Sequence, residues 1–305
     1  MPATPILPTD AEIDAIVVRP GSLLYRRFGD ARLFLASGYA LLLQVAHPTV
    51  GSGVRDHSNF LEDPWGRLLR TLDYLNMLIY GGDEAAAVGR RLRDLHKPIK
   101  GQNPDGSHYH ALEPEAYAWV HATLLEGALA AHRRFVGRLR AAEEEQFLAE
   151  FMPLGRLLGV RDRDMPASMA AFHRYYDEMV RTRLERTSSV EDVIGAFGAA
   201  PPPPSFPPQM QALWKLLRVP PAQVLRISSF GLMPSHLRAK LDIPWSAANE
   251  AELRALGVAA RSVTPLMPQR LRQTGPAYLR WRREEIARGP LGPGEPGVDP
   301  SAVAA

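Results

Sequence analysis

The sequence predicts an all-α protein folded as a single large helical domain. Apolar residues recur at helical spacing along most of the chain, and the alternating pattern typical of strands is nearly absent. Several helix starts are also well marked. At Asp63-Pro64 and Glu113-Pro114 an acidic residue stands at the cap and a proline in the first turn, where its missing N–H costs no hydrogen bond. The expected helices cover 11–17, 21–28, 30–46, 51–59, 64–81, 83–95, 114–140, 142–152, 165–184, 189–197, 207–219, 220–230, 234–241, 246–259 and 269–288.

Two linkers interrupt this pattern. Residues 97–112 contain two prolines and two glycines and form a long loop with room for a hairpin. Residues 199–208 are dense in proline, which makes a stiff, extended connection. We expect one helical domain over 1–288, followed by a frayed tail over 289–305 that is rich in proline, glycine and alanine.

Composition excludes several classes of protein and of site. The 305 residues are 46% hydrophobic, which is enough for a sizeable core. The net charge is only +3 and no basic tract interleaves with aromatics, so nucleic acid is not an expected partner. The chain has no cysteine. Disulfides, zinc–thiolate sites, iron–sulfur clusters and thiolate-ligated haem are therefore excluded, and a metal would need histidine, carboxylate or tyrosine ligands.

No targeting or membrane-spanning segment is expected. Residues 1–27 carry early proline and acidic residues and lack the basic-then-apolar run of a signal peptide. The most apolar stretch, 33–46, is interrupted by polar residues and is too short to span a bilayer. The expected location is the cytoplasm.

Polar side chains share one face of the expected helix 64–81: Arg67, Arg70, Thr71 and Tyr74. The remaining faces of this helix are largely apolar, so it should be buried and its polar stripe should need partners. One interpretation pairs the arginines with carboxylates such as Glu62 or Asp73. The other directs them at an anionic or oxygen ligand, and the spacing alone does not decide between the two.

A single imidazole, His121, lies in the middle of the long apolar helix expected over 114–140. Small residues such as Ala122 and Gly127 surround it and would allow a flat cofactor to approach. A lone histidine on an apolar helix is more often a core residue whose hydrogen bonds are satisfied. The cationic face of helix 64–81 nevertheless makes His121 a candidate metal ligand.

Three further histidines are candidates for contacts with a cofactor. His47 lies just before Pro48, which ends an apolar helix, and His57 follows ten residues later. They could ligate a non-haem metal, but we expect them to line a pocket or contact a haem propionate. His96 lies at a helix end and is expected to cap it or to contact a propionate. The absence of an HExxH pair and of a two-histidine-one-carboxylate spacing weakens the non-haem alternative.

These motifs together resemble the superfamily of rubber oxygenases (latex-clearing proteins) and fungal endoplasmic-reticulum-bound oxygenases of the mycophenolic-acid pathway. The resemblance covers roughly residues 20–240. The residues that carry it are Gln44-Val45-Ala46-His47-Pro48, Asp56-His57-Ser58, Asp63-Pro64 with Arg67, Arg70 and Thr71, His96-Lys97-Pro98, and Trp119-Val120-His121-Ala122.

The resemblance implies a globin-reminiscent helical fold that holds haem b. The proximal histidine of the rubber oxygenases, in a short His-Ala motif, corresponds to His121. Their distal Arg-x-x-Lys-Thr motif corresponds to Arg67, Arg70 and Thr71, with Arg70 replacing the lysine. That lysine can occupy the sixth coordination position of the iron, whereas a guanidinium is poorly suited to it.

The resemblance predicts a haem b-dependent oxygenase or dioxygenase that acts on a small hydrophobic substrate, alkene or isoprenoid-like, together with dioxygen. His121 would ligate the iron, and Arg67, Arg70 and Thr71 would be the catalytic residues. Two alternatives stay open: a non-catalytic helical protein that binds a hydrophobic ligand or a partner helix, and a haem-based gas sensor or carrier. A homo-oligomer is a further open alternative.

Overall fold

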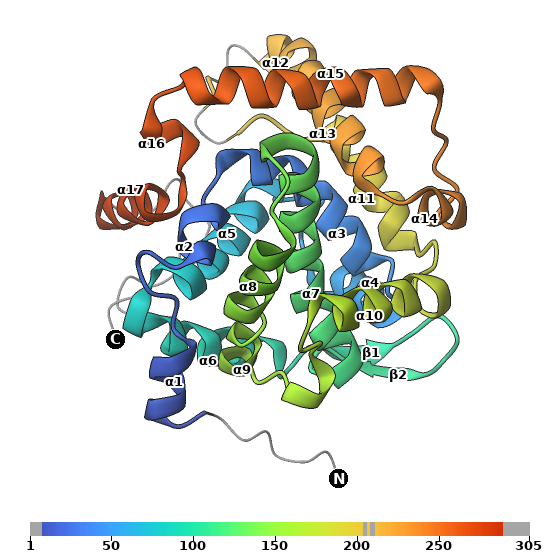
Figure 1. Cartoon of the computed structure of the whole chain (residues 1–305). Coiled ribbons are helices and arrows are strands. Elements are labelled where there is room, and N and C mark those ends of the chain that lie inside the picture. Colours follow the sequence, from blue (N-terminus) through green and yellow to red (C-terminus); the bar gives the residue numbers. More distant parts are fainter. Residues whose placement is uncertain (1–7, 204–205, 208–210, 289–305) are drawn as a thin grey trace.

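Helices form nearly all of the chain in the computed structural model, which describes residues 8–203, 206–207 and 211–288 (Figure 1). The all-α prediction is confirmed. The α-helices are α1 Asp10–Ile16, α2 Leu23–Phe28, α3 Ser37–Val45, α4 Pro48–His57, α5 Pro64–Tyr80, α6 Ala85–His96, α7 Pro114–Ala131, α8 Ala141–Phe151, α9 Leu154–Leu158, α10 Met169–Thr182, α11 Ser188–Ala199, α12 Gln211–Leu217, α13 Val219–Leu232, α14 Ser235–Lys240, α15 Ala247–Val263, α16 Gln269–Arg272 and α17 Gly275–Arg288.

In the described ranges, strands occur only in the expected loop 97–112. There β1 (Lys100–Gln102) pairs with β2 (His108–His110) as an antiparallel hairpin, with Lys100 opposite His110. The hairpin predicted for this loop is therefore present. The expected tail 289–305 lies outside the described residues.

Helix α7 lies at the centre of the fold, surrounded by the other helices (Figure 1). It is buried along nearly its whole length because it is apolar on all sides. It packs against α3, where the indole Nε1 of Trp119 donates to the backbone carbonyl of Leu43 at 2.9 Å. The main hydrophobic core runs from Ile16 to Ile243, so elements from both halves of the chain share it.

Three expected helices change helix type or divide in the structure. The one expected over 114–140 ends at Ala131 and continues as a π-helical turn, His132–Val136, up to Gly137, whose φ of +152° favours glycine. The one expected over 30–46 begins as a 3₁₀ helix, Ala31–Ala36. The one expected over 269–288 divides into α16 and α17, because the backbone between them pairs with Gly29 and Asp30.

Helices α5 and α6 pack against each other and are joined by a short connection. Asp63 caps α5 by accepting a hydrogen bond from the backbone N–H of Gly66 at 2.8 Å, as the sequence predicts. The connection uses Gly82, whose φ of +59° suits glycine. Helices joined so closely run antiparallel, so residues equally far from the turn lie at the same level.

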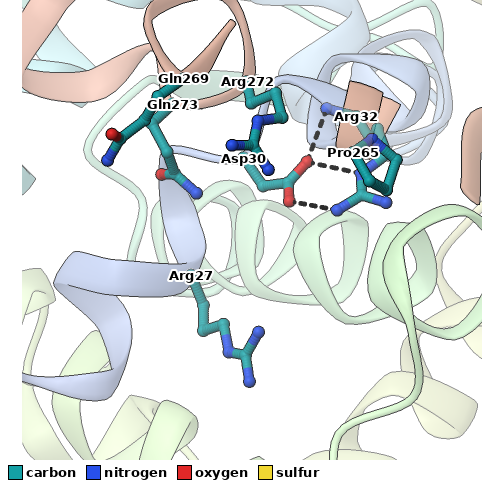
Figure 2. A pocket seen from close by; sticks show the side chains of 7 residues that line it. All are labelled: Arg27, Asp30, Arg32, Pro265, Gln269, Arg272 and Gln273. Carbon is teal, nitrogen blue, oxygen red and sulfur yellow. Dashed lines mark hydrogen bonds and ion pairs between the residues drawn. The ribbon is translucent and has the colours of Figure 1, made fainter. Parts of the chain in front are cut away.

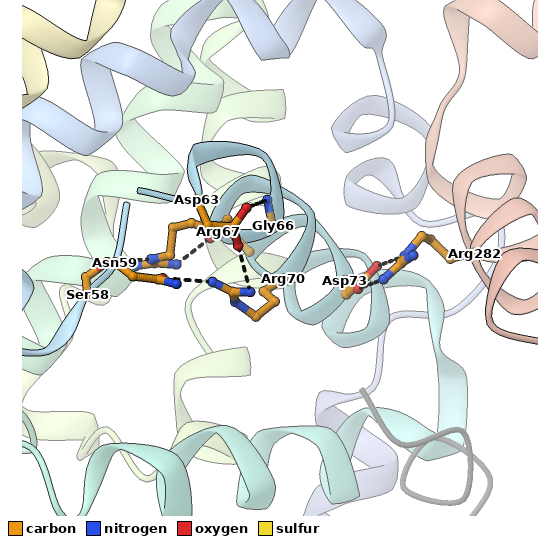
Figure 3. A network of polar contacts seen from close by, with 9 residues as sticks. Ser58, Asn59, Asp63, Gly66, Arg67, Arg70, Asp73 and Arg282 are labelled. Carbon is orange, nitrogen blue, oxygen red and sulfur yellow. Dashed lines mark hydrogen bonds and ion pairs between the residues drawn. The ribbon is translucent and has the colours of Figure 1, made fainter. Parts of the chain in front are cut away.

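The C-terminal helix α17 packs against α5 through a largely buried ion pair (Figures 1 and 3). Arg282 donates from Nε and Nη2 to the two carboxylate oxygens of Asp73, each at 2.8 Å, and the Tyr278 hydroxyl donates to Asp73 at 2.7 Å. The side chains of Asp73 and Arg282 are only 13% and 15% exposed. A bidentate pair removed from water to this degree is costly to break.

None of the described helices is by itself long and apolar enough to cross a bilayer. One pair, Ala31–Val45 with Pro48–His57, reaches that length and hydropathy jointly, but it is bent by 103°.

We expect Arg282→Ala to lower the free energy of unfolding by about 3 kcal/mol, because it leaves the Asp73 carboxylate unpaired in a largely buried place. The matched control is Arg283→Ala, which breaks an exposed pair with Glu84 and should cost less than about 1 kcal/mol. Urea unfolding of both variants measures the difference. Equal losses would show that the Asp73–Arg282 pair does not anchor α17.

A second prediction concerns pH. His132 is 1% exposed, and burial lowers its pKa to about 4. The unfolded chain takes up this proton near pH 6.5 but the folded chain does not until about pH 4, so stability falls with pH in that window. Between pH 7 and 5 the wild type should lose about 2 kcal/mol more than His132→Gln. Parallel pH profiles of the two proteins in denaturant unfolding would contradict this.

Candidate active site

Arg67 projects from the first half of α5, where two hydroxyl groups hold its guanidinium (Figure 3). Its Nη1 donates to the hydroxyl of Thr71 at 2.6 Å, and its Nε donates to the hydroxyl of Ser58 at 3.3 Å. No carboxylate of a described residue lies within 4.0 Å of this guanidinium. Burial, and secondarily the Arg70 cation, lower the pKa of Arg67. The side chain is thus a half-buried cation with neutral partners.

Arg70, one turn further along α5, is engaged differently (Figure 3). It donates from Nη1 to the Asp63 carboxylate at 3.3 Å and from Nη2 to the side-chain oxygen of Asn59 at 3.1 Å. The sequence offered Glu62 or Asp73 as partners for the two arginines. Instead Asp63 fills that role for Arg70, and Asp73 is bound by Arg282.

His96 lies at the end of α6 with one ring nitrogen engaged. Its Nδ1 is 2.7 Å from the backbone carbonyl of Leu92, one turn earlier. A carbonyl only accepts, so Nδ1 carries the proton and Nε2 has a free lone pair. Burial lowers the pKa of His96, and the Arg67 cation lies near enough to lower it further.

Tyr117 of α7 covers His96 from a second side. The two ring centroids are 5.7 Å apart with planes tilted by 59°. The Tyr117 hydroxyl is buried and no described residue bonds to it. The structure therefore brings His96 and Tyr117 into contact and Arg67 into their neighbourhood, from three different helices.

His121 lies one turn beyond Tyr117 on α7 and is enclosed by α8 and α9. Its ring stacks on Phe151 with centroids 4.7 Å apart, and its Nε2 is 3.2 Å from the backbone carbonyl of Met152. Gly155 lies so close that a Cβ there would be 3.1 Å from the imidazole Cδ2. Burial lowers the pKa of His121 to about 4. These contacts are those of a packed core histidine.

The other two candidate histidines lie elsewhere. His47 is buried at the start of α4, and its Nε2 is 3.5 Å from Glu115, at the limit of a hydrogen bond. Burial is the main cause that lowers its pKa. His57 is exposed, and its Nε2 lies 3.2 Å from the carbonyl of Lys100, so it fastens α4 to the hairpin. No described contact joins either histidine to Arg67.

The register of the α5–α6 hairpin explains why Arg67 lies near enough to His96 to affect its pKa. Arg67 lies fourteen residues before Gly81, and His96 lies fourteen residues after Gly82. In an antiparallel hairpin these positions face each other. The sequence contained this signal, because the two glycines mark the turn between the expected helices.

His96 could supply one protein ligand to a haem. Among the described residues no group of three or more histidine, aspartate or glutamate side chains could hold a bare metal ion. A haem brings four nitrogens of its own and needs only one protein ligand. His96 offers Nε2 and a fixed tautomer for that purpose, whereas His121, whose Nε2 is held by the Met152 carbonyl, would have to offer Nδ1 from a ring stacked on Phe151. Two cavities of about 280 and 260 Å³ lie away from these residues.

The comparison with known proteins agrees with the motifs that surround this site. No curated protein and no solved structure matches the chain. One family matches residues 25–262, described as the ER-bound oxygenase mpaB/B'/rubber oxygenase catalytic domain. The match covers the helices that carry Arg67, His96, Tyr117 and His121. The chain therefore belongs to the family of ER-bound oxygenase and rubber oxygenase catalytic domains.

Proposed function

We propose that this oxygenase-family chain is a haem b-dependent oxygenase that acts on a small hydrophobic substrate of the alkene or isoprenoid class. The observation that carries the proposal is the hydrogen bond from Nδ1 of His96 to the Leu92 carbonyl. Because Nδ1 is bound to the Leu92 carbonyl, the Nε2 lone pair is on the opposite side of the imidazole ring and is available to a ligand. The half-buried Arg67 lies near this histidine.

His96, rather than the His121 expected from the sequence, would be the protein ligand of the haem iron. Metal-ligating histidines commonly donate their second ring N–H to a carbonyl or carboxylate, which fixes the tautomer and raises ligand basicity. His96 has that arrangement through Leu92. To serve instead, His121 would have to bind through Nδ1 while its ring stacks on Phe151, or release Nε2 from the Met152 carbonyl.

Haem, when bound, would supply the activation of dioxygen. Arg67 would stabilise negative charge that develops on oxygen as dioxygen is reduced, because a preorganised cation in a half-buried place costs no reorganisation. Thr71 would hold the guanidinium in place through its 2.6 Å hydrogen bond. Arg70, bound to Asp63 and Asn59, would position the start of α5.

One further group supports the same site. The unpartnered Tyr117 hydroxyl beside His96 is available to a bound molecule.

Haem titration tests the ligand. The wild type should give a Soret band with hemin, and His96→Gly should bind hemin at least ten-fold more weakly, with recovery on adding free imidazole. His121→Ala is the matched control and should keep the band. If His121→Ala loses the band while His96→Gly keeps it, the ligand is His121. A protein that takes up no hemin would favour the alternative of a haem-free helical binding protein.

Oxygen uptake separates an enzyme from a gas sensor or carrier. With isoprenoid alkenes, Arg67→Ala should lower the rate of oxygen consumption about 100-fold while haem content is unchanged. Thr71→Val removes only the positioning hydrogen bond and should cost less, roughly ten-fold. Normal turnover in Arg67→Ala would contradict the role given to this arginine. A haem protein that binds oxygen but consumes none would be a sensor or carrier.

A further inference from the structure

A cavity of about 280 Å³ opens far from the candidate active site, where the end of α2 and the following 3₁₀ helix meet α16 (Figure 2). Three arginines and two glutamines surround a single carboxylate there. The lining residues that matter are Arg27, Asp30, Arg32, Gln269, Arg272 and Gln273.

The cavity has a surplus of positive charge. Both carboxylate oxygens of Asp30 accept hydrogen bonds from Arg32, which donates from Nε at 2.8 Å and from Nη2 at 2.6 Å. The charges of these two side chains therefore cancel. Arg27 has only a distant carboxylate, Glu143, at 4.0 Å. No described carboxylate pairs with Arg272, and its buried Nε has no hydrogen-bond partner.

A buried guanidinium N–H without an acceptor is destabilising unless a ligand supplies one. Oxyanions suit this set best, because arginine binds phosphate with two parallel hydrogen bonds and the glutamine amides can add more. The cavity volume is sufficient for a phosphate group.

Exposed apolar side chains flank the lining residues along the chain, and we call this group the apolar rim. Leu266 and Met267 follow the lining residue Pro265 and are 84% and 37% exposed, and Leu271, which precedes Arg272, is 50% exposed. Phe34, two residues after Arg32 on the 3₁₀ helix that packs against α16, is 47% exposed. Single exposed apolar residues are normal in proteins, but several that flank the lining of one charged cavity indicate an interaction site.

We propose that this face docks on an anionic phospholipid surface, with a lipid phosphate in the arginine cavity and the apolar rim at the boundary between headgroups and acyl chains. Such binding needs both the arginines and the apolar rim, since cations attract the anionic surface and apolar side chains insert into it. The proposal goes beyond the oxygenase function and does not depend on it.

Sedimentation of the purified full-length chain with vesicles tests this. Phosphatidylcholine vesicles that contain phosphatidylglycerol should bind the wild type, and pure phosphatidylcholine vesicles should bind much less. Arg272→Gln should weaken binding to the anionic vesicles about five-fold, and Leu266→Ser should weaken it as well. Arg174→Gln, which removes an exposed charge on α10, is the matched control and should bind as the wild type does.

Several outcomes would overturn the proposal. Equal binding to both vesicle types would exclude recognition of the phosphate, and equal losses in Arg272→Gln and Arg174→Gln would indicate general charge attraction. Protection of the wild type against thermal unfolding by inorganic phosphate, without any vesicle binding, would indicate a site for a soluble phosphate. Arg272→Gln should keep the wild-type melting temperature without vesicles. If it does not fold, Leu266→Ser decides, because that side chain is almost fully exposed.

Discussion

The candidate site depends on the register of one helical hairpin. The turn at Gly81 and Gly82 sets α6 against α5, so that a histidine at the end of one helix lies level with an arginine near the start of the other. A single backbone hydrogen bond, from Nδ1 of His96 to Leu92, then decides which imidazole nitrogen is free. A shift of one residue in this hairpin would rotate His96 by about 100° around α6 and separate the two groups.

The hairpin is held in place from several sides. Asp63 serves α5 twice, as the helix cap and as the ion-pair partner of Arg70. At the middle of α5, Asp73 is bound by Arg282 of α17, a helix beyond the region that matches the family. The surroundings of Arg67 are therefore stabilised by elements from opposite ends of the chain, which suits a cation that must keep its position without a carboxylate partner.

Much of this arrangement could be predicted from the sequence, and the contacts that it did not predict have specific physical reasons. Helical periodicity and the Asp63-Pro64 start predicted α5 correctly, because both signals are local. The sequence indicated His121 as the iron ligand through the family resemblance and the small residues around it, and that assignment stays a prediction. The Met152 carbonyl near Nε2 of His121 could not be predicted, because a contact with the backbone of another helix leaves no local pattern in the sequence. The Asp73–Arg282 ion pair could not be predicted either, because the two residues are 209 positions apart in the sequence.

The central claim is that His96 holds one haem at the α5–α6 hairpin. The most direct test is a crystal structure of the hemin-loaded chain with an anomalous map at the iron absorption edge. We expect a single iron peak within bonding distance of Nε2 of His96. An iron peak at His121, at His47 or at a site without any histidine would contradict it.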